Sequence, residues 1–427
     1  MPDRASAFRV AIRRFPPFAD AISRQWAAFE ATHQTGLRLE AESLDLNPLV
    51  DALFTSGGLR NGDWDIAFVV TDWLAGAVAE GALRDIAPDL ARLPAPDYPE
   101  GWAVALTRVQ QFGDAIYGLP YHDGPECLIY RTDLFADAAE QDAFERRYGY
   151  PLAVPRTWDA FADVAEFFTR PEAGLYGTVL AGFPDGHNTV YDFCLQLWSR
   201  GGDLLDAAGR PTLDTPEAAA ALDFYRFLVR SRAHTPPRPE EIDSVRSGEL
   251  FASGAVAMMV NWFGFAAVCE QPGCPVKGKT AVTTLPSAPG AEPASLIVYW
   301  LLAVGAGSPH AETAYAFARH CATAPMDKVT TLAGGIGCRL STWTDPEVNA
   351  LIPFYAELPG LCAGARTLPR SRQFRRSRTL STRQCRGRSA EYAGRRHPAP
   401  RSGSGSRSDA CGLAGDPHDE PCWLRRL

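Results

Sequence analysis

One stretch of the chain, from Ala115 to Phe135, limits the folds open to this sequence. It contains an extended segment, a turn region marked by Gly118 and Pro120, and a second extended segment over residues 126–130. Proline biases the residue before it towards extended geometry, so we expect Pro120 to mark a crossover. Strand and helix patterns alternate both before and after this stretch. We therefore predict two α/β lobes that the stretch links across a cleft.

Length and charge narrow the class of protein. A chain of 427 residues is long enough for two domains that each have a hydrophobic core. The formal net charge of −8 argues against binding to nucleic acid. The charge is uneven, because residues 361–427 contain 15 Arg and 5 acidic residues, a net +10, and residues 1–360 therefore carry −18. The sequence has no apolar run long enough to predict a transmembrane helix.

The Arg-rich segment 361–427 has no hydrophobic period, and we expect it to be disordered. Such a tail is one form of tether to nucleic acid or to a membrane surface. A second reading rests on residue usage: residues 1–360 contain 24 Arg and 3 Lys, which is typical of a GC-rich gene. Reading such a gene out of frame produces this mixture of Arg, Ser, Gly and Pro. We favour a frameshift near Arg370, and resequencing the gene's end in the same frame would contradict it.

The first part of the chain alternates strand and helix patterns. Strands are expected over residues 8–12, 37–41 and 65–70, with helices over 18–29 and 46–54 between them. This alternation predicts a parallel, doubly wound sheet, in which ligands bind beyond the carboxyl ends of the strands. Four side chains follow such strand ends: Arg14, Phe15, Asp72 and Trp73.

The second part continues the pattern. We expect one helix capped by Thr157, another that begins at Pro216, and a strand over residues 255–261. A further strand over 280–285 ends at Pro286, the candidate for a second crossover. A buried strand is expected over residues 296–304.

Taken in order, these segments resemble the extracellular solute-binding proteins of bacterial ABC importers, in the sugar-type group that includes maltose-binding protein. The resemblance covers roughly residues 8–359. It rests on loose motifs in register: Asp65-Ile-Ala-Phe, Asp72-Trp, Tyr117-Gly-Leu-Pro-Tyr, Leu128-Ile-Tyr-Arg-Thr-Asp-Leu-Phe, Pro155-Arg-Thr-Trp-Asp, Gly201-Gly-Asp-Leu-Leu, Phe251-Ala-Ser-Gly-Ala-Val-Ala-Met, Asn261-Trp and Thr284-Leu-Pro.

The resemblance implies a two-lobed, periplasmic-binding-protein-like fold with a hinge and an interlobe cleft. The N-terminal lobe would comprise residues 6–118 plus 287–327, and the C-terminal lobe residues 122–283 plus 328–360. It further implies a periplasmic monomer that passes a sugar or polyol to ABC permease subunits, without cofactor or catalysis. Family members carry an export signal that the N-terminus lacks, so we expect a misplaced start or a mature form.

Sugar sites place flat aromatic faces and a few polar groups within an apolar cleft. Trp262, beside Asn261, matches the family's cleft-wall aromatic, although a core tryptophan would give the same pattern. Asp72 and Trp73 match a position that binds hydroxyl groups, and the alternative for Asp72 is a helix cap. Arg14 and Phe15 follow the first strand, where a solvated loop is the alternative.

The crossover supplies further candidates: Tyr121, His122, Asp123 and Glu126. In the family this segment lines the cleft floor. The same ionisable side chains together with Cys127 suggest a metal site, but their spacing fits no zinc pattern and offers too few carboxylates for a hard cation.

Three more segments contain candidates on weaker grounds. His187 and Asn188 lie in a loop typical of the cleft edge of the second lobe. In the strand over 296–304, Tyr299 and Trp300 point in opposite directions, so one faces the core and Tyr299 is a candidate for the cleft. Arg339 ends a Gly-rich segment that either reaches the solute or merely stops a helix.

Two further motifs each have two possible interpretations. Residues 273–280 match the phosphate-loop pattern, but that loop needs a strand before it and a helix after it, and here the order is reversed. Cys269 and Cys274 flank a turn and are either a disulfide or two thiols. The sequence therefore favours a non-catalytic sugar trap. A sugar-acting enzyme that pairs Asp72 with Glu126 is the alternative, and a nucleotide-hydrolysing protein comes third.

Overall fold

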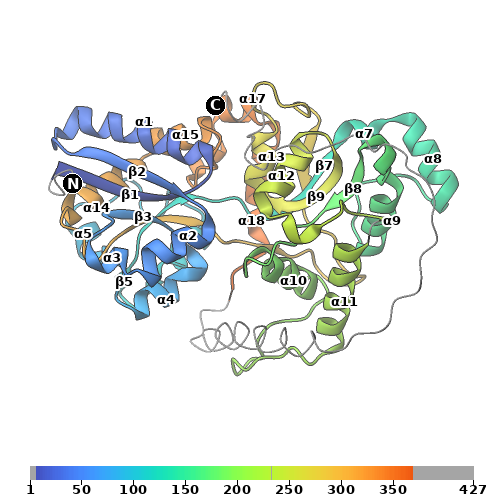
Figure 1. Cartoon of the computed structure of the whole chain (residues 1–427), viewed down its shortest axis with the longest axis horizontal. Coiled ribbons are helices and arrows are strands. Elements are labelled where there is room, and N and C mark those ends of the chain that lie inside the picture. The colour runs from blue at the N-terminus through green and yellow to red at the C-terminus, as the bar shows by residue number, and fades with distance from the viewer. Residues whose placement is uncertain (1–5, 232, 369–427) are drawn as a thin grey trace, which may run out of the picture. The chain divides into compact units, whose positions relative to one another are not determined.

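Two mixed β-sheets hold most of the strands of this protein (Figure 1). They are seen in a computed structural model that describes residues 6–231 and 233–368. These residues belong to one compact unit, Met1–Pro369. Most of the Arg-rich tail, including the frameshift position near Arg370, lies outside the described residues.

The first sheet has the strand order β2-β1-β3-β12-β6. Its strands are β1 (Ala7–Arg13), β2 (Arg38–Leu44), β3 (Ile66–Val70), β6 (Leu119–His122) and β12 (Trp300–Val304). β1 is parallel to β2 and β3, whereas β12 is antiparallel to β3 and β6. The predicted parallel arrangement is therefore confined to three strands, because β12 joins the sheet from a distant part of the chain and in the opposite direction.

Helix α1 (Pro16–His33) begins at a proline, which is favoured there because the first helical N–H has no intrahelical partner to lose. It buries the apolar stripe that the sequence predicts. Within that stripe Trp26 stacks on Phe8 of β1, with ring centroids 4.6 Å apart. Trp26 also contacts the edge of Phe317 in α14 (Ala311–Cys321) at 5.1 Å. The core of the first sheet is thus closed on this side by α1 and α14.

Short elements complete this part of the chain. They are α2 (Leu46–Val50), a π-helical turn (Asp51–Thr55), α3 (Gly58–Asn61), a 3-10 turn (Thr71–Trp73), α4 (Leu74–Ala79), α5 (Ala87–Arg92), α6 (Ala105–Arg108), β4 (Gln111–Phe112) and β5 (Ala115–Ile116).

The second sheet has the order β10-β7-β9-β8, in which β8 and β9 are parallel and the other pairs antiparallel. Its strands are β7 (Glu126–Arg131), β8 (Tyr176–Val179), β9 (Val256–Trp262) and β10 (Thr280–Thr283). The chain around it forms α7 (Thr132–Ala136), α8 (Ala138–Tyr148), α9 (Trp158–Phe168), a 3-10 turn (Pro171–Ala173), α10 (Asn188–Trp198), α11 (Pro216–Arg230), a second 3-10 turn (Pro239–Glu241), α12 (Ser244–Ala252) and α13 (Phe263–Val268). Thr157 caps α9 and α11 begins at Pro216, as predicted.

The chain first passes from one sheet to the other at residues 123–125, between β6 and β7. This passage lies within the stretch that the sequence singles out. Pro120 itself lies inside β6 and not at the crossover. Proline is tolerated there because β6 is at the edge of its sheet, where a missing N–H costs no ladder hydrogen bond.

The second passage differs from the prediction. Residues 296–304 are not one strand: β11 (Ser295–Leu296) pairs with β13 (Ala365–Arg366), and β12 joins the first sheet. The chain therefore leaves the second half at residues 297–299 and not at Pro286. Just after that proline, the Ser287 amide still bonds the Arg156 carbonyl. Both pieces of the apolar run are buried, so hydrophobicity alone cannot show where it divides.

The remaining elements are α15 (Ala324–Leu332), α16 (Leu340–Trp343), α17 (Pro346–Leu351), a 3-10 turn (Pro353–Glu357) and α18 (Leu358–Ala363). Composition assigns residues 361–368 to the tail, yet they are ordered. Arg366 pairs with Asp203, and its guanidinium lies 4.8 Å from the Trp198 ring centroid. Charge content cannot reveal such partners, because they are distant in sequence.

The phosphate-loop pattern at residues 273–280 follows helix α13 and precedes strand β10. This is the reversed order that the sequence predicts, and it confirms that no helix start is available there to hold phosphate. Cys269 and Cys274 are both free thiols in this structure. The Cys269 thiol donates to the Phe265 carbonyl at 3.2 Å, and the Cys274 thiol donates to the Ala252 carbonyl at 3.5 Å.

Candidate functional site

A cavity of about 350 Å³ lies where the ends of the first-sheet strands meet helix starts of the second half. From the first half it is lined by Arg13, Arg14, Phe15, Phe18, Asp45, Leu46, Asn47, Pro48, Val70 and His122. From the second half and the crossovers it is lined by Gly124, Phe183, Asp185, His187, Asn188, Tyr191, Asp243, Ser244, Val245, Trp262, Gly264, Phe265 and Val298, and Trp300 of β12 in the first sheet completes the lining. The carboxyl ends of β1, β2 and β3 all border it, as the rule for open α/β sheets predicts.

Six of the candidate residues from the sequence line this cavity: Arg14, Phe15, His122, His187, Asn188 and Trp262. They come from both halves of the chain. That they contact a solute remains a prediction.

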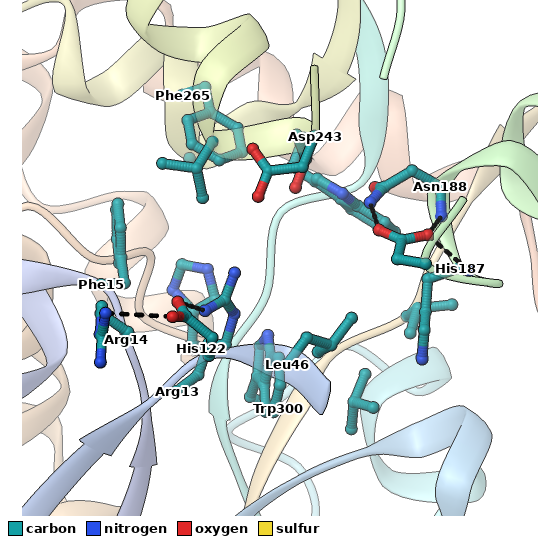
Figure 2. Close-up of a pocket in the computed structure, with 18 of the residues that line it drawn as sticks. Arg13, Arg14, Phe15, Leu46, His122, His187, Asn188, Asp243, Phe265 and Trp300 are labelled. Atoms are coloured by element: carbon teal, nitrogen blue, oxygen red, sulfur yellow. Dashed lines mark hydrogen bonds and ion pairs between the residues drawn. The ribbon is translucent and has the colours of Figure 1, made fainter. Parts of the chain in front are cut away.

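Two arginines share one carboxylate at the first-half wall of the cavity (Figure 2). Arg13 Nη1 lies 3.1 Å from Asp45 Oδ1, and Arg14 Nη1 lies 3.0 Å from Asp45 Oδ2. Only 13% of the Arg13 side chain is exposed, against 61% for Arg14. Arg13 and Asp45 were not predicted from the sequence, although the rule for strand ends finds Arg13 when it is extended by one residue and Asp45 when it is extended to the second strand.

Helix starts supply the polar groups on the opposite wall (Figure 2). Asp185 Oδ1 accepts hydrogen bonds from the backbone N–H groups of His187 and Asn188, at 2.8 and 3.0 Å. Asp243 Oδ1 caps α12 by accepting the Arg246 N–H at 2.8 Å. Carboxylates are favoured at helix starts because the unpaired N–H groups and the dipole attract negative charge. Neither aspartate was singled out from the sequence.

One hydrogen-bonded chain joins the two halves beside the cavity. Trp73 Nε1–H donates to His187 Nε2 at 3.3 Å, and His187 Nδ1 lies 2.7 Å from Tyr191 Oη. Tyr191 in turn donates to Asp72 Oδ2 at 2.8 Å. An indole N–H can only donate, so neutral His187 carries its proton on Nδ1. Every donor in the chain therefore points towards the Asp72 carboxylate.

The structure excludes one of the two interpretations of Asp72, that of a helix cap. The 3-10 turn at Thr71–Trp73 has no side-chain cap hydrogen bond, so Asp72 is not a helix cap. Neither Asp72 nor Trp73 lines the cavity. Each is hydrogen-bonded to a residue that does line the cavity: Asp72 to Tyr191, and Trp73 to His187.

Aromatic rings surround the cavity. Trp262 meets Tyr191 edge-on with ring centroids 5.7 Å apart, and Trp300 meets Trp73 edge-on at 5.6 Å. Phe15 and Phe265, from opposite halves, lie 6.2 Å apart. The hydrogen-bonded chain and this phenylalanine pair are two separate contacts between the halves at the cavity.

The structure reverses the choice between Tyr299 and Trp300. Trp300 lines the cavity, whereas Tyr299 is fully buried and its hydroxyl lies 2.8 Å from the Leu106 carbonyl oxygen. Adjacent side chains do alternate as expected. The alternation alone cannot say which side faces the solute, because both faces of this segment are covered.

Three other candidates also lie outside the cavity lining, because tertiary partners occupy them. The Tyr121 hydroxyl donates to Gln25 in α1. The Asn261 amide donates to the Ser244 carbonyl at 3.0 Å. Arg339, only 2% exposed, pairs with Asp97.

Asp123 and Glu126 are buried and do not line the cavity. Burial raises the pKa of Asp123 to about 7. Burial, and then the negative charge of Asp192, raise the pKa of Glu126 well above its usual value, and burial raises the pKa of Asp192 to about 8. Glu126 and Asp192 therefore stay largely protonated at neutral pH, whereas Asp123 is protonated about half of the time.

The enzyme alternative needs two carboxylates that flank a bond of the substrate. Neither Asp72 nor Glu126 lines the cavity, so the geometry does not support that pairing. Within residues 6–231 and 233–368, no group of three or more His, Cys, Asp or Glu side chains is arranged to hold a metal ion. Over the same residues, no helix combines the length and apolarity that a membrane crossing requires.

A mixed two-sheet fold with two chain crossovers and a cavity between the halves defines a class of hinged binding proteins. Residues 16–328 match the family described as bacterial extracellular solute-binding protein. The chain belongs to this family.

Similar proteins support the same assignment. A probable ABC transporter-binding protein of Deinococcus radiodurans is 25% identical over 307 residues, covering 70% of this chain and 68% of the relative. A putative ABC transporter periplasmic-binding protein of Escherichia coli K12, YcjN, is 29% identical over 150 residues, 35% of this chain and 30% of the relative.

Two solved structures show the same fold. The maltose-bound MalE3 protein of T. maritima has a TM-score of 0.74 at 23% identity, covering 87% of this chain and 91% of its own. A solute-binding protein of Agrobacterium radiobacter K84 in complex with ribitol has a TM-score of 0.73 at 24% identity, with coverages of 83% and 86%.

Proposed function

We propose that this protein is the solute-binding component of an ABC importer and that it holds a neutral sugar or polyol in the cavity between its two halves. The observation that carries the proposal is the composition of the cavity wall. Trp262 and Trp300 offer aromatic surface, while Arg13, Arg14 and Asn188 offer hydrogen-bonding groups. Sugars present apolar ring faces and hydroxyl edges that such a wall matches.

The charge of the lining favours a neutral solute over a strongly ionic one. Its two arginines are opposed by three carboxylates, Asp45, Asp185 and Asp243. One carboxylate already pairs with both arginines, and the other two accept backbone N–H groups at helix starts. The solutes bound in structurally similar proteins, maltose, ribitol, D-mannitol and α-D-tagatose, are likewise neutral.

We further propose that the two halves act as lobes that close over the solute about the two crossovers. The two sheets support a first lobe built around residues 7–122 plus 300–304 and a second built around residues 126–283. The protein would act as a periplasmic monomer that hands its solute to permease subunits. It would perform no chemistry and need neither cofactor nor nucleic acid.

Thermal melting against a panel of neutral sugars and polyols, sugar phosphates and Mg-ATP tests this proposal. A bound solute at about 100 times its dissociation constant should raise the free energy of unfolding by about 2.7 kcal/mol. A shift with Mg-ATP alone, or release of a product from a bound glycoside, would overturn the proposal.

The cavity assignment needs its own variant. We expect Trp262→Ala to weaken solute binding by about tenfold or more, because aromatic faces carry much of the contact area. Phe227→Ala on α11 is the control, since this ring is 47% exposed and lies away from the cavity lining. Equal affinities for the two variants would place the solute elsewhere.

A further inference from the structure

His122 is the last residue of strand β6, next to the first crossover, and it lines the cavity. Its Nδ1 lies 2.8 Å from the backbone nitrogen of Ile336. A backbone N–H can only donate, so Nδ1 must present its lone pair. The neutral ring therefore carries its proton on Nε2.

The segment that holds His122 is itself rigidly anchored. The Ile336 carbonyl accepts the Asp123 N–H at 3.2 Å. Both backbone groups of Ile336 therefore hydrogen-bond to the crossover region, the N–H to His122 and the carbonyl to Asp123. Further along the segment, Asp327 Oδ1 accepts the Cys338 N–H at 2.8 Å, and Asp327 Oδ2 accepts the Arg339 N–H at 3.1 Å. The Gly-rich segment before Arg339 thus does not line the cavity. It brings one amide to His122 instead.

The other ring nitrogen of His122, Nε2, is available to hydrogen-bond a molecule in the cavity. The Nε2 edge of the ring lies beside Gly264, which also lines the cavity, and a methyl group added to that glycine would come within 3.7 Å of Nε2. Among the described residues, the structure gives Nε2 no hydrogen-bonding partner, although it gives Nδ1 one. Rings of Phe15 and Phe18 pack around the imidazole, at centroid distances of 6.4 and 4.7 Å.

We propose that His122 is a specificity-determining residue that offers its Nε2–H as a donor to an acceptor oxygen of the solute. This inference rests on the proposed function. It requires a hydroxyl or ring oxygen at that point of the solute and disfavours an ammonium group there.

The charge state fits this role. Burial lowers the pKa of His122 to about 3. The charged groups on neighbouring elements are Arg13 and Asp45, which pair with each other, and Asp123, whose carboxyl group is largely protonated below pH 7. None of them supplies an unpaired negative charge that would favour an imidazolium ion.

Nitrogen NMR of histidine-labelled protein tests the donor directly. Long-range ¹H–¹⁵N spectra distinguish the two neutral tautomers, and His187 is an internal standard because its Nε2 accepts the Trp73 N–H. We expect His122 to show the Nε2–H form and His187 the Nδ1–H form, both assigned by substitution. A His122 resonance in the Nδ1–H form, or one that becomes doubly protonated above pH 5, would overturn the proposal.

Two matched variants test the contact with the solute. Asn at position 122 can keep an acceptor near the Nδ1 position but loses the donor at Nε2, whereas Gln places an amide N–H near Nε2. We expect His122→Asn to weaken binding by about 10- to 100-fold with a nearly unchanged solute-free melting temperature, and His122→Gln to recover most of this loss. A solute analogue that lacks the contacted oxygen should bind wild type and His122→Asn equally.

The outcomes separate the two proposals. If wild-type protein binds no sugar or polyol, the proposed function fails, while the tautomer measurement still decides the donor state of His122. If wild type binds a solute and His122→Asn binds it equally well, the function stands and the inference about His122 is wrong.

Discussion

At the scale of single residues, the most informative feature is the hydrogen-bonded chain from Trp73 through His187 and Tyr191 to Asp72. It crosses between the two halves without using any group of the solute. Part of the free energy that joins the two halves beside the cavity is therefore built into the protein. A solute needs to supply only the remainder.

Removing one hydroxyl group from this chain should weaken solute binding. We expect Tyr191→Phe to lower the affinity by about tenfold, because the Asp72 carboxylate loses a donor that is present only when the halves meet. The solute-free melting temperature should change little. Calorimetric titration measures the affinity.

Tyr150→Phe provides the matched control. Its hydroxyl also donates to a carboxylate, Asp163, at 2.8 Å, but both residues lie in the second half. If the two phenylalanine variants lose affinity equally, the interlobe chain has no special role in closure.

The buried carboxyl group of Asp192 should make stability depend on pH. Its pKa of about 8 in the folded state lies above the usual value, so between about pH 4 and 8 the folded protein holds a proton that the unfolded chain releases. Stability therefore falls as pH rises through this range. Glu126 acts in the same direction. The lowered pKa of His122 acts oppositely below about pH 6.5, so the clearest window is pH 6.5–8.

We expect Asp192→Asn to flatten this dependence. The free energy of unfolding of wild type should fall more steeply than that of the variant, by up to about 1.4 kcal/mol per pH unit. Urea unfolding at several pH values measures the slopes. Asp223→Asn on α11, where the side chain is 75% exposed, is the control. Parallel slopes for all three proteins would show that Asp192 is already ionised when folded.

At the scale of elements, Asp327 in α15 organises the segment that follows the helix. Its carboxylate accepts the Cys338 and Arg339 amides and also the Thr342 hydroxyl, at 2.6 Å. The neighbouring Gly337 has no room for a side chain, because an added carbon would lie 2.3 Å from Asp327 Oδ2. One carboxylate thus sets the conformation of the loop that holds His122.

We expect Asp327→Asn to destabilise the protein by about 2–3 kcal/mol, because the amide NH₂ would face backbone donors in a buried site. Urea unfolding measures the loss. The variant should also weaken solute binding, since the loop positions Ile336 against His122. Unchanged stability would mean that the loop keeps its shape without this carboxylate.

At the scale of the whole molecule, the proposal predicts a change of shape. If the two halves close over a solute about the crossovers at residues 123–125 and 297–299, saturating solute should reduce the radius of gyration. Small-angle X-ray scattering with and without solute measures it. A bound solute that leaves the scattering curve unchanged would contradict hinge closure.

Much of the fold follows from the sequence because local pattern records burial. The alternation of strands and helices, the stripe that contains Trp26, the Thr157 cap and the crossover between β6 and β7 are all local signals. Strand ends also point to Arg14 and Phe15, since parallel strands present their carboxyl ends at one edge, and the crossover stretch points to His122. The sequence also predicts correctly that a helix precedes residues 273–280 and a strand follows them.

Other features were decided only by tertiary structure. The division of residues 296–304 between two sheets, the antiparallel β12 and the pairing of β13 depend on partners that are far away in sequence. For the same reason, sequence could not assign Trp300 to the cavity and Tyr299 to the core. It placed Arg339 near the solute, although Asp97 and the surrounding backbone carbonyls occupy its guanidinium. A side chain's direction depends on which distant groups satisfy it, and only the folded chain brings those groups together.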